Sequence, residues 1–203
     1  MSGIIAQNVG RHGGLIKAPS GGGGGTWTLI QTLTSGGSDS DLSFTSGIDS
    51  TYDEYVFKFI NIHPETDEVY LTFNGSADSG SNYNVTKTTS TFVARHDEGD
   101  TETSFAYTAA DDLSESTSFQ IITGVVGNGN DESASGYLHL FNPSSTTFVK
   151  QFIATANTYD RNDRSTNEFI AGYFNTTSAV DAIQFKMSAD EIQAGSISMY
   201  GIS

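Results

Sequence analysis

Short apolar runs separated by turn-forming residues constrain the fold of this chain most strongly. From residue 26 onward, hydrophobic and aromatic side chains gather in runs about as long as a β-strand, and Gly, Ser, Asn, Asp and Pro fill the intervals. Runs of this length and composition are typical of strands. About ten of them at intervals of roughly 8 to 15 residues predict an all-β fold, an antiparallel β-sandwich of jelly-roll type.

The run at 54–63 is the most strongly apolar. Tyr55, Phe57 and Phe59 are expected on one face, and Val56, Ile60 and Ile62 on the other, so this strand is predicted to be central. A turn at 64–67 and a second apolar run at 68–73 predict an antiparallel hairpin. Further strands are expected at 26–34, 42–48, 85–94, 119–126, 136–141, 147–157, 168–174, 179–187 and 196–202.

Two segments break the strand pattern. Residues 95–118 scatter seven carboxylates around Phe105 and Tyr107 and predict a long loop with short pieces of structure. Residues 188–195 predict one short helical turn, because Ser188 can cap it, Glu191 follows three residues later, and Gly195 can end it.

A run of five glycines after Pro19 divides the chain into two parts, an N-terminal arm at 1–25 and a β-sandwich domain at 26–203. The arm contains Arg11 and Lys17 and no carboxylate, whereas all 24 Asp and Glu residues lie in the sandwich domain. We expect the arm to be a docking element, with Ile4, Ile5, Arg11, Leu15, Ile16 and Lys17 contacting a partner.

Composition excludes several classes of partner. A formal net charge of -15 repels phosphate backbones and anionic lipid, so neither nucleic acid nor a membrane is expected as a partner. There are no cysteines, which excludes disulfides and thiolate chemistry. The first residues lack the charged and apolar regions of an export signal, and no run is long enough to span a membrane.

No catalytic constellation is recognisable, so we expect no enzymatic activity, no cofactor and no metal site. The sequence His96-Asp97-Glu98 has acid/base or metal-binding residue types, but we interpret it as a solvated loop. His139 lies between two leucines and is expected to pack on a strand. The paired carboxylates sit in expected loops, where a structural Ca²⁺ is an alternative, but none has the spacing of a calcium loop. Glycosidase chemistry is disfavoured because no acidic residue is expected inside an apolar strand.

Tyrosines in or beside polar loops suggest a second kind of function. Tyr52, Tyr83, Tyr107 and Tyr159 have this placement, and aromatic rings can stack on sugars. Glycan binding, through Tyr83 and Tyr159 above all, is the alternative to a structural role.

Four stretches of the chain carry a resemblance to a known group. They are MSGIIAQNVGRH at 1–12, DSTYDEYVFKFINIHP at 49–64, GYLHLFNP at 136–143 and YGI at 200–202. In them, and over nearly its whole length, the chain resembles virion structural proteins of marine tailed bacteriophages that infect cyanobacteria and ocean heterotrophs.

The resemblance implies a non-enzymatic virion component assembled in the host cytoplasm. Two roles follow from it. The first is a capsid decoration or cement protein, docked through its arm on the major capsid protein and present as a homotrimer. The second is a tail-fibre or head-fibre module that binds host-surface glycans.

Overall fold

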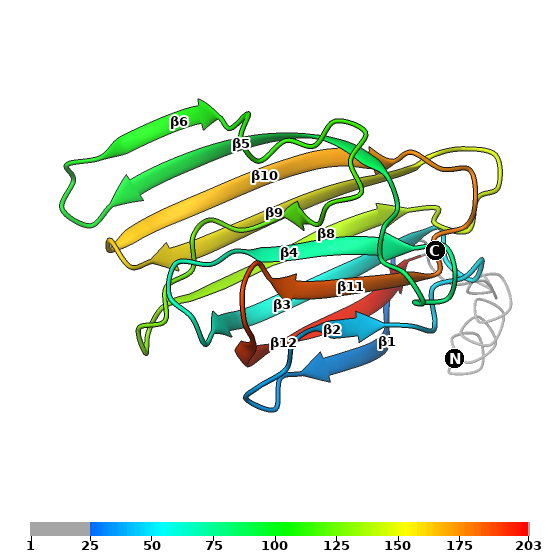
Figure 1. The fold of residues 1–203 in the computed structure, drawn as a ribbon, viewed down its shortest axis with the longest axis horizontal. Helices are drawn as coiled ribbons and strands as arrows, with labels where there is room; N and C mark the ends of the chain where they lie inside the picture. The colour runs from blue at the N-terminus through cyan, green and yellow to red at the C-terminus, as the bar shows by residue number, and fades with distance from the viewer. Residues whose placement is uncertain (1–24, 203) are drawn as a thin grey trace, which may run out of the picture.

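In the computed structural model, residues 25–202 are described, and they form an antiparallel β-sandwich without helices (Figure 1). This confirms the fold class expected from the spacing of the apolar runs. The strands are β1 Trp27–Thr34, β2 Leu42–Phe44, β3 Glu54–Pro64, β4 Leu71–Ser76, β5 Lys87–Asp97, β6 Thr103–Tyr107, β7 Gln120–Ile121, β8 Ser133–Phe141, β9 Lys150–Asp160, β10 Arg164–Phe174, β11 Ala182–Met187 and β12 Ile192–Ile202.

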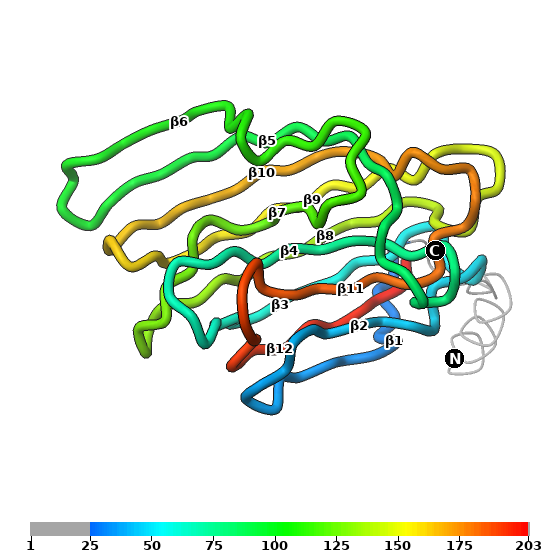
Figure 2. The backbone as a smooth tube through the Cα atoms, in the orientation of Figure 1, coloured from blue at the N-terminus to red at the C-terminus, as the bar shows by residue number. Residues whose placement is uncertain are grey.

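The two sheets are unequal in size. The larger has eight strands in the order β1-β12-β3-β8-β9-β10-β5-β6, and the smaller has four in the order β2-β11-β4-β7. Outside the β5–β6 and β8–β9–β10 hairpins, each connection carries the chain from one sheet to the other, as the tube in Figure 2 shows. The segment between β6 and β8 passes in front of β5, β10 and β9 (Figure 1), and it contributes β7 to the edge of the smaller sheet.

The core lies between the sheets and is rich in phenylalanine. Phe57 of the large sheet contacts Phe44 and Phe185 of the small sheet, with ring centroids 5.3 and 5.5 Å apart. Phe73 and Phe152 meet across the same interface at 5.1 Å. These side chains are all but fully buried, and edge-to-face aromatic pairs add to the free energy gained by burial.

The strand at Glu54–Pro64 is central, as predicted, but its predicted hairpin is wrong. β3 pairs with β12 on one side and with β8 on the other, while β4 lies in the small sheet between β11 and β7. The turn between them, with Glu68 at φ 61°, is an arch between the two sheets. An apolar run packed against another from the opposite sheet has the same alternation as a hairpin partner, so the sequence pattern does not separate the two cases.

A bulge changes which way the end of β3 points. The register with β8 shifts between Phe59 and Ile62, and Asn61 has a φ of 52°. Ile62 is therefore buried with Phe59 on the inner face, whereas it was expected beside Ile60, which is 43% exposed on the outer face. A β-bulge adds one residue and reverses the alternation beyond it.

Both irregular segments differ from expectation. Residues 95–118 contain the end of β5 and all of β6, which form a hairpin, so the long loop was predicted too broadly. Residues 188–195 form no helical turn: Ser188 bonds to Tyr70 and Ile192 begins β12. A helix this short gains little by itself, and sheet pairing of Ile192 overrides its capping residues.

The strand expected at 119–126 was also too long, since only Gln120–Ile121 is strand. Within residues 25–202, no helix is long and apolar enough to cross a membrane.

Candidate docking face

The outer face of the eight-stranded sheet is lined with apolar side chains. Among the described residues, the large hydrophobic side chains with substantial exposure all lie on this face except Phe148 and Val149. We call it the aromatic face and define it by Trp27, Leu29, Phe92, Phe105, Tyr107, Tyr137, His139, Phe141, Ile153, Phe169, Tyr173 and Tyr200.

These residues are exposed because their strands carry apolar side chains on both faces. In β9, Ile153 points outward and is 48% exposed, while its neighbours Phe152 and Ala154 are buried in the core. A solvated sheet face normally carries polar residues at such positions. β9 therefore departs from the simple alternation of a strand with one solvated face.

Register aligns the outward side chains in three rows across the sheet, because directly paired residues share a face. One row runs Tyr107, Phe92, Phe169, Thr155 and Tyr137 from β6 to β8. The next runs Ser90, Ala171, Ile153 and His139. A third contains Thr88, Tyr173 and Gln151 on one side and Phe141, Glu54, Ile202 and Trp27 on the other.

Aromatic contacts organise the β6 side of the face. Phe92 stacks on Phe169 with centroids 4.8 Å apart and planes 10° from parallel, and Phe105 lies 5.4 Å from Phe92. Phe105 is nevertheless 74% exposed. The group is therefore held together by its own ring contacts, and Phe105 is its most exposed member.

A second aromatic group surrounds His139 on the β1 side. Trp27 and Tyr137 meet its ring edge-on at 6.3 and 5.1 Å. Its Nδ1 donates to Glu54 Oε1. His139 thus packs on a strand, as expected, but faces outward as part of this surface.

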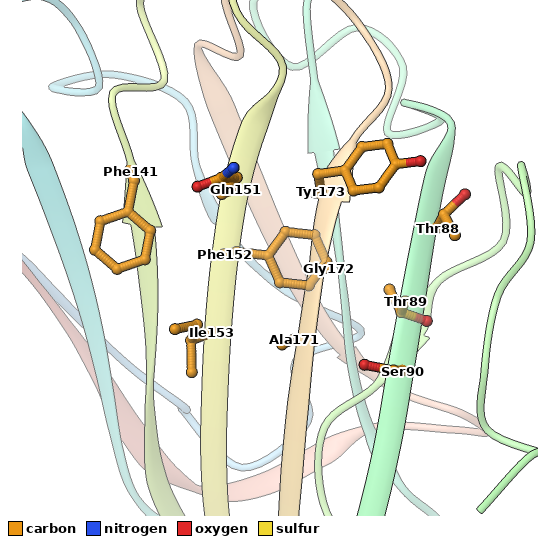
Figure 3. Close-up of a pocket in the computed structure, with 10 residues that line it drawn as sticks. All are labelled: Thr88, Thr89, Ser90, Phe141, Gln151, Phe152, Ile153, Ala171, Gly172 and Tyr173. Carbon is orange, nitrogen blue, oxygen red and sulfur yellow. The ribbon is translucent and has the colours of Figure 1, made fainter.

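A hollow of about 460 Å³ lies between these two groups (Figure 3). Phe141 from β8 and Tyr173 from β10 flank it, and Ala171 and Gly172 leave its floor low. Gln151 lies between the two rings, and its side-chain amide has no hydrogen-bond partner among the described residues. Small residues between large ones make the hollow, and the unpaired amide gives it a polar group.

Charge is scarce on the aromatic face. Within the three rows, the formally charged side chains are Glu54 and Lys58, although the chain has 24 carboxylates. The far end of the sheet is different: Asn157, Asn167 and Ser165 form a polar patch there, with Ser165 Oγ donating to Asn157 Oδ1 at 2.8 Å. The apolar surface therefore ends at this polar patch.

The two tyrosines proposed for glycan contact lie far apart. Tyr83 is in the β4–β5 connection, and its hydroxyl is buried without a partner among the described residues. Tyr159 lies near the β9–β10 turn at the opposite end of the sandwich and donates to Asp163 Oδ1 at 2.9 Å. That bond raises the pKa of Tyr159 to about 12. The structure does not bring the two together in one site.

The other predicted residues are placed as follows. Tyr107 belongs to the aromatic face, and Tyr52 packs against the core edge-on to Tyr55. His96 lies exposed on β5 and contacts Asp100 at 3.1 Å. The arm residues Ile4, Ile5, Arg11, Leu15, Ile16 and Lys17 lie outside the described residues. Within residues 25–202, no group of three His, Asp or Glu side chains is arranged to hold a metal ion.

Sequence reasoning missed two buried carboxyls, Asp160 and Glu168, each 2% exposed, and Asp160 is paired with Arg164 at 2.8 Å. Glu168 begins the strand expected at 168–174 but was not expected to be buried, and it lies on the inner face of β10. Burial raises its pKa to about 7, with Asp111 adding to the effect and Arg95 opposing it. Arg95 Nη2 lies 4.0 Å from Oε1, whereas Oε2 has no hydrogen-bond partner among the described residues. The enclosed carboxyl affects stability and is not open to a bound substrate.

Comparison of the chain with protein-family models, with curated proteins and with solved structures finds no match. The functional conclusion therefore depends on the aromatic face itself.

Proposed function

We propose that this chain is a non-enzymatic structural subunit of a bacteriophage virion, of the capsid decoration or cement type, and that its aromatic face is the side that docks. The observation that carries the proposal is the concentration of exposed aromatic and aliphatic side chains on one sheet face. Soluble monomers rarely expose apolar patches above a few hundred Å².

The size of the face suits a protein partner. Eight strands about 4.8 Å apart and three rows about 7 Å apart give a surface of roughly 34 by 14 Å, to which the side chains add a margin. These backbone dimensions enclose about 480 Å², more than half of the roughly 800 Å² that a stable protein interface takes from each partner, before the margin of the side chains is added. The near-absence of charge also fits, because the centres of interfaces are poor in charged residues.

The arm and the acidic surface complete the proposed role. The weakly basic arm reaches a neighbouring major capsid protein, and the carboxylates remain on the surfaces turned away from the contact. Trimer formation, expected from the resemblance, belongs to the same proposal.

Particle incorporation tests this function. Ile153→Lys and Phe105→Lys place charges on the aromatic face and are expected to abolish incorporation while leaving the unfolding temperature nearly unchanged. Gln184→Lys, on the outer face of the small sheet, is the matched control and should be incorporated normally. Electron cryo-microscopy of the particle should find copies distributed over the shell. Copies confined to the tail, or normal incorporation of both face variants, would contradict the proposal.

The hollow supports the alternative function of a fibre module that binds host-surface glycans. Two rings, Phe141 and Tyr173, flank the unpaired amide of Gln151, and this combination of stacking surface and hydrogen-bonding group is what a sugar requires. Tyr173→Ala and Gln151→Ala should each weaken glycan binding about tenfold, the effect of losing one good contact. Unchanged host adsorption by both variants would exclude this role.

A further inference from the structure

The described part of the chain begins beside the aromatic face. Gly25 precedes Trp27, and Trp27 is an outward residue of the edge strand β1, with its ring 5.4 Å from Tyr200 on the same face. Residues 1–24 are therefore attached at the edge of the aromatic face, which no other described residue covers.

The distances allow these residues to reach across the face. The hollow lies about four to five strand spacings from β1, or roughly 22 Å. The nine residues from Ile16 to Gly25 span about 16 Å as a flexible coil and about 30 Å when extended, which brackets that distance. The twenty residues from Ile5 to Gly25 can span more than about 34 Å, enough to reach β6 at the far edge.

The chemistry of this segment also matches the face. Two apolar pairs, Ile4–Ile5 and Leu15–Ile16, are spaced so that one can reach the hollow and the other the Phe92–Phe105 group. The segment has two basic residues and no acidic one. Glu54 is the carboxylate within the three rows and lies on β3, between Trp27 and the hollow.

We propose that residues 1–24 lie across the aromatic face of their own chain in the free subunit, with Leu15 and Ile16 in the hollow between Phe141 and Tyr173. The attachment at Trp27 favours the chain's own face over that of another copy, because a short flexible linker gives an effective concentration in the millimolar range. A partner that binds the face replaces this cover. The proposal concerns the isolated chain and does not rest on the virion assignment.

Engineered cysteines test the contact directly, because the chain has no cysteine of its own. Ile16→Cys combined with Ser90→Cys, at the hollow, should form a disulfide within one chain at dilute protein concentration. Ile16→Cys with Gln184→Cys, on the opposite sheet, is the matched control and should form that bond at least about tenfold more slowly, as expected for ends not held together. Equal rates for the two pairs, or disulfide-linked dimers in place of the internal bond, would overturn the proposal.

Trp27 supplies an independent readout, since it is the single tryptophan of the chain. Leu15→Ser with Ile16→Ser should release the segment from the hollow, so that the residues joining the hollow to Trp27 no longer shield its ring, and acrylamide quenching of its fluorescence should increase by about two-fold. Ala6→Ser with Ala18→Ser is the control and should leave quenching unchanged. The far-ultraviolet spectrum of each variant should match that of the parent. Identical quenching in the Leu15/Ile16 variant and the parent would count against the cover. Normal particle incorporation of both Ile153→Lys and Phe105→Lys, together with the expected cysteine and quenching results, would instead count against the proposed function alone.

Discussion

Ile153 illustrates how a single side chain separates folding from function in this protein. Its neighbours on β9 are buried between the sheets, while it stands 48% exposed beside the hollow. Replacing it with a polar residue removes no core contact, so its hydrophobic character is not needed for the fold. Glu168 is the opposite case, a polar side chain placed where the fold would be more stable without charge.

Glu168→Gln is expected to stabilise the protein at alkaline pH. The folded-state pKa of about 7 lies above the ordinary glutamate value of 4.5, so the neutral carboxyl supports folding below about pH 4.5. That contribution is lost as pH rises towards 7. The substitution should therefore change stability little at pH 4 and raise it by about 1–3 kcal/mol at pH 8. Urea unfolding at both pH values measures the difference, and a variant less stable than the parent at pH 8 would contradict the assignment.

Lys87 is a buried residue whose loss should destabilise the protein. Its Nζ donates to Asn74 Oδ1, Val85 O and Ser118 O, at 2.8, 3.2 and 2.6 Å. Lys87→Met removes these three bonds, although Asn74 Oδ1 keeps the bond from Gly75 N, and should lower the free energy of unfolding by about 2–4 kcal/mol. Lys58→Met, at an exposed position, serves as the control. Thermal unfolding compares the two, and equal midpoints would show that the three bonds contribute nothing.

At the scale of the element, β10 depends on close approach of its neighbours. It pairs along its whole length with β9 and β5, and its residues alternate between the core and the aromatic face. The small residues Ala171 and Gly172 serve both sides: they let Phe152 pack beneath the strand and keep the floor of the hollow low above it.

Gly172→Ala should destabilise the sandwich by about 1–3 kcal/mol, because the space is already filled. A Cβ at this position would lie 2.6 Å from Thr88 O and from Thr89 Cγ2. Gly36→Ala is the matched control, since its Cβ would meet only Asp39 Oδ2 at 3.6 Å. Chemical denaturation should show a lower midpoint for Gly172→Ala and almost no change in midpoint for Gly36→Ala. A fully stable Gly172→Ala protein would mean that β5 and β10 are farther apart than described.

For the whole molecule, charge and hydrophobicity are segregated. Carboxylates give the chain its net charge of -15 but are nearly missing from the aromatic face. Repulsion between carboxylates keeps the other surfaces of neighbouring molecules apart in solution. The aromatic face can associate without repulsion from like charges.

Salt should therefore stabilise the folded molecule at neutral pH. Raising NaCl from about 0.01 to 0.3 M shortens the screening length from about 30 to 6 Å and weakens repulsion among the carboxylates. The unfolding temperature should rise by about 2–5 °C, the shift expected from roughly 1 kcal/mol in a domain of this size. Calorimetry near the isoelectric point is the control, where the increase should disappear. A decrease with salt at pH 7 would show that attractive ion pairs dominate.

Alternation within single runs was enough to predict most of the strands and the all-β class, although it missed β6 and overextended the strand at β7. The apolar residues of β3 and β9 predict strands whatever position those strands take in the sheets, because the period-two geometry of side chains is a local property. The same local reasoning failed for the β3–β4 hairpin and for Ile62. Which strands pair, and where a bulge reverses the alternation, depends on partners distant in sequence.

The sequence by itself determined the β-class, the division at the glycine run and the separation of charge between the arm and the acidic domain, because these follow from residue type and order. Tertiary structure alone decided that Trp27, His139, Ile153 and Phe92 lie on one surface that no second sheet covers within residues 25–202, and that Glu168 is enclosed. The physical reason is that a strand apolar on both sides does not reveal which side receives the second sheet. That is settled when the four-stranded sheet packs on one face of the large sheet and leaves the other exposed.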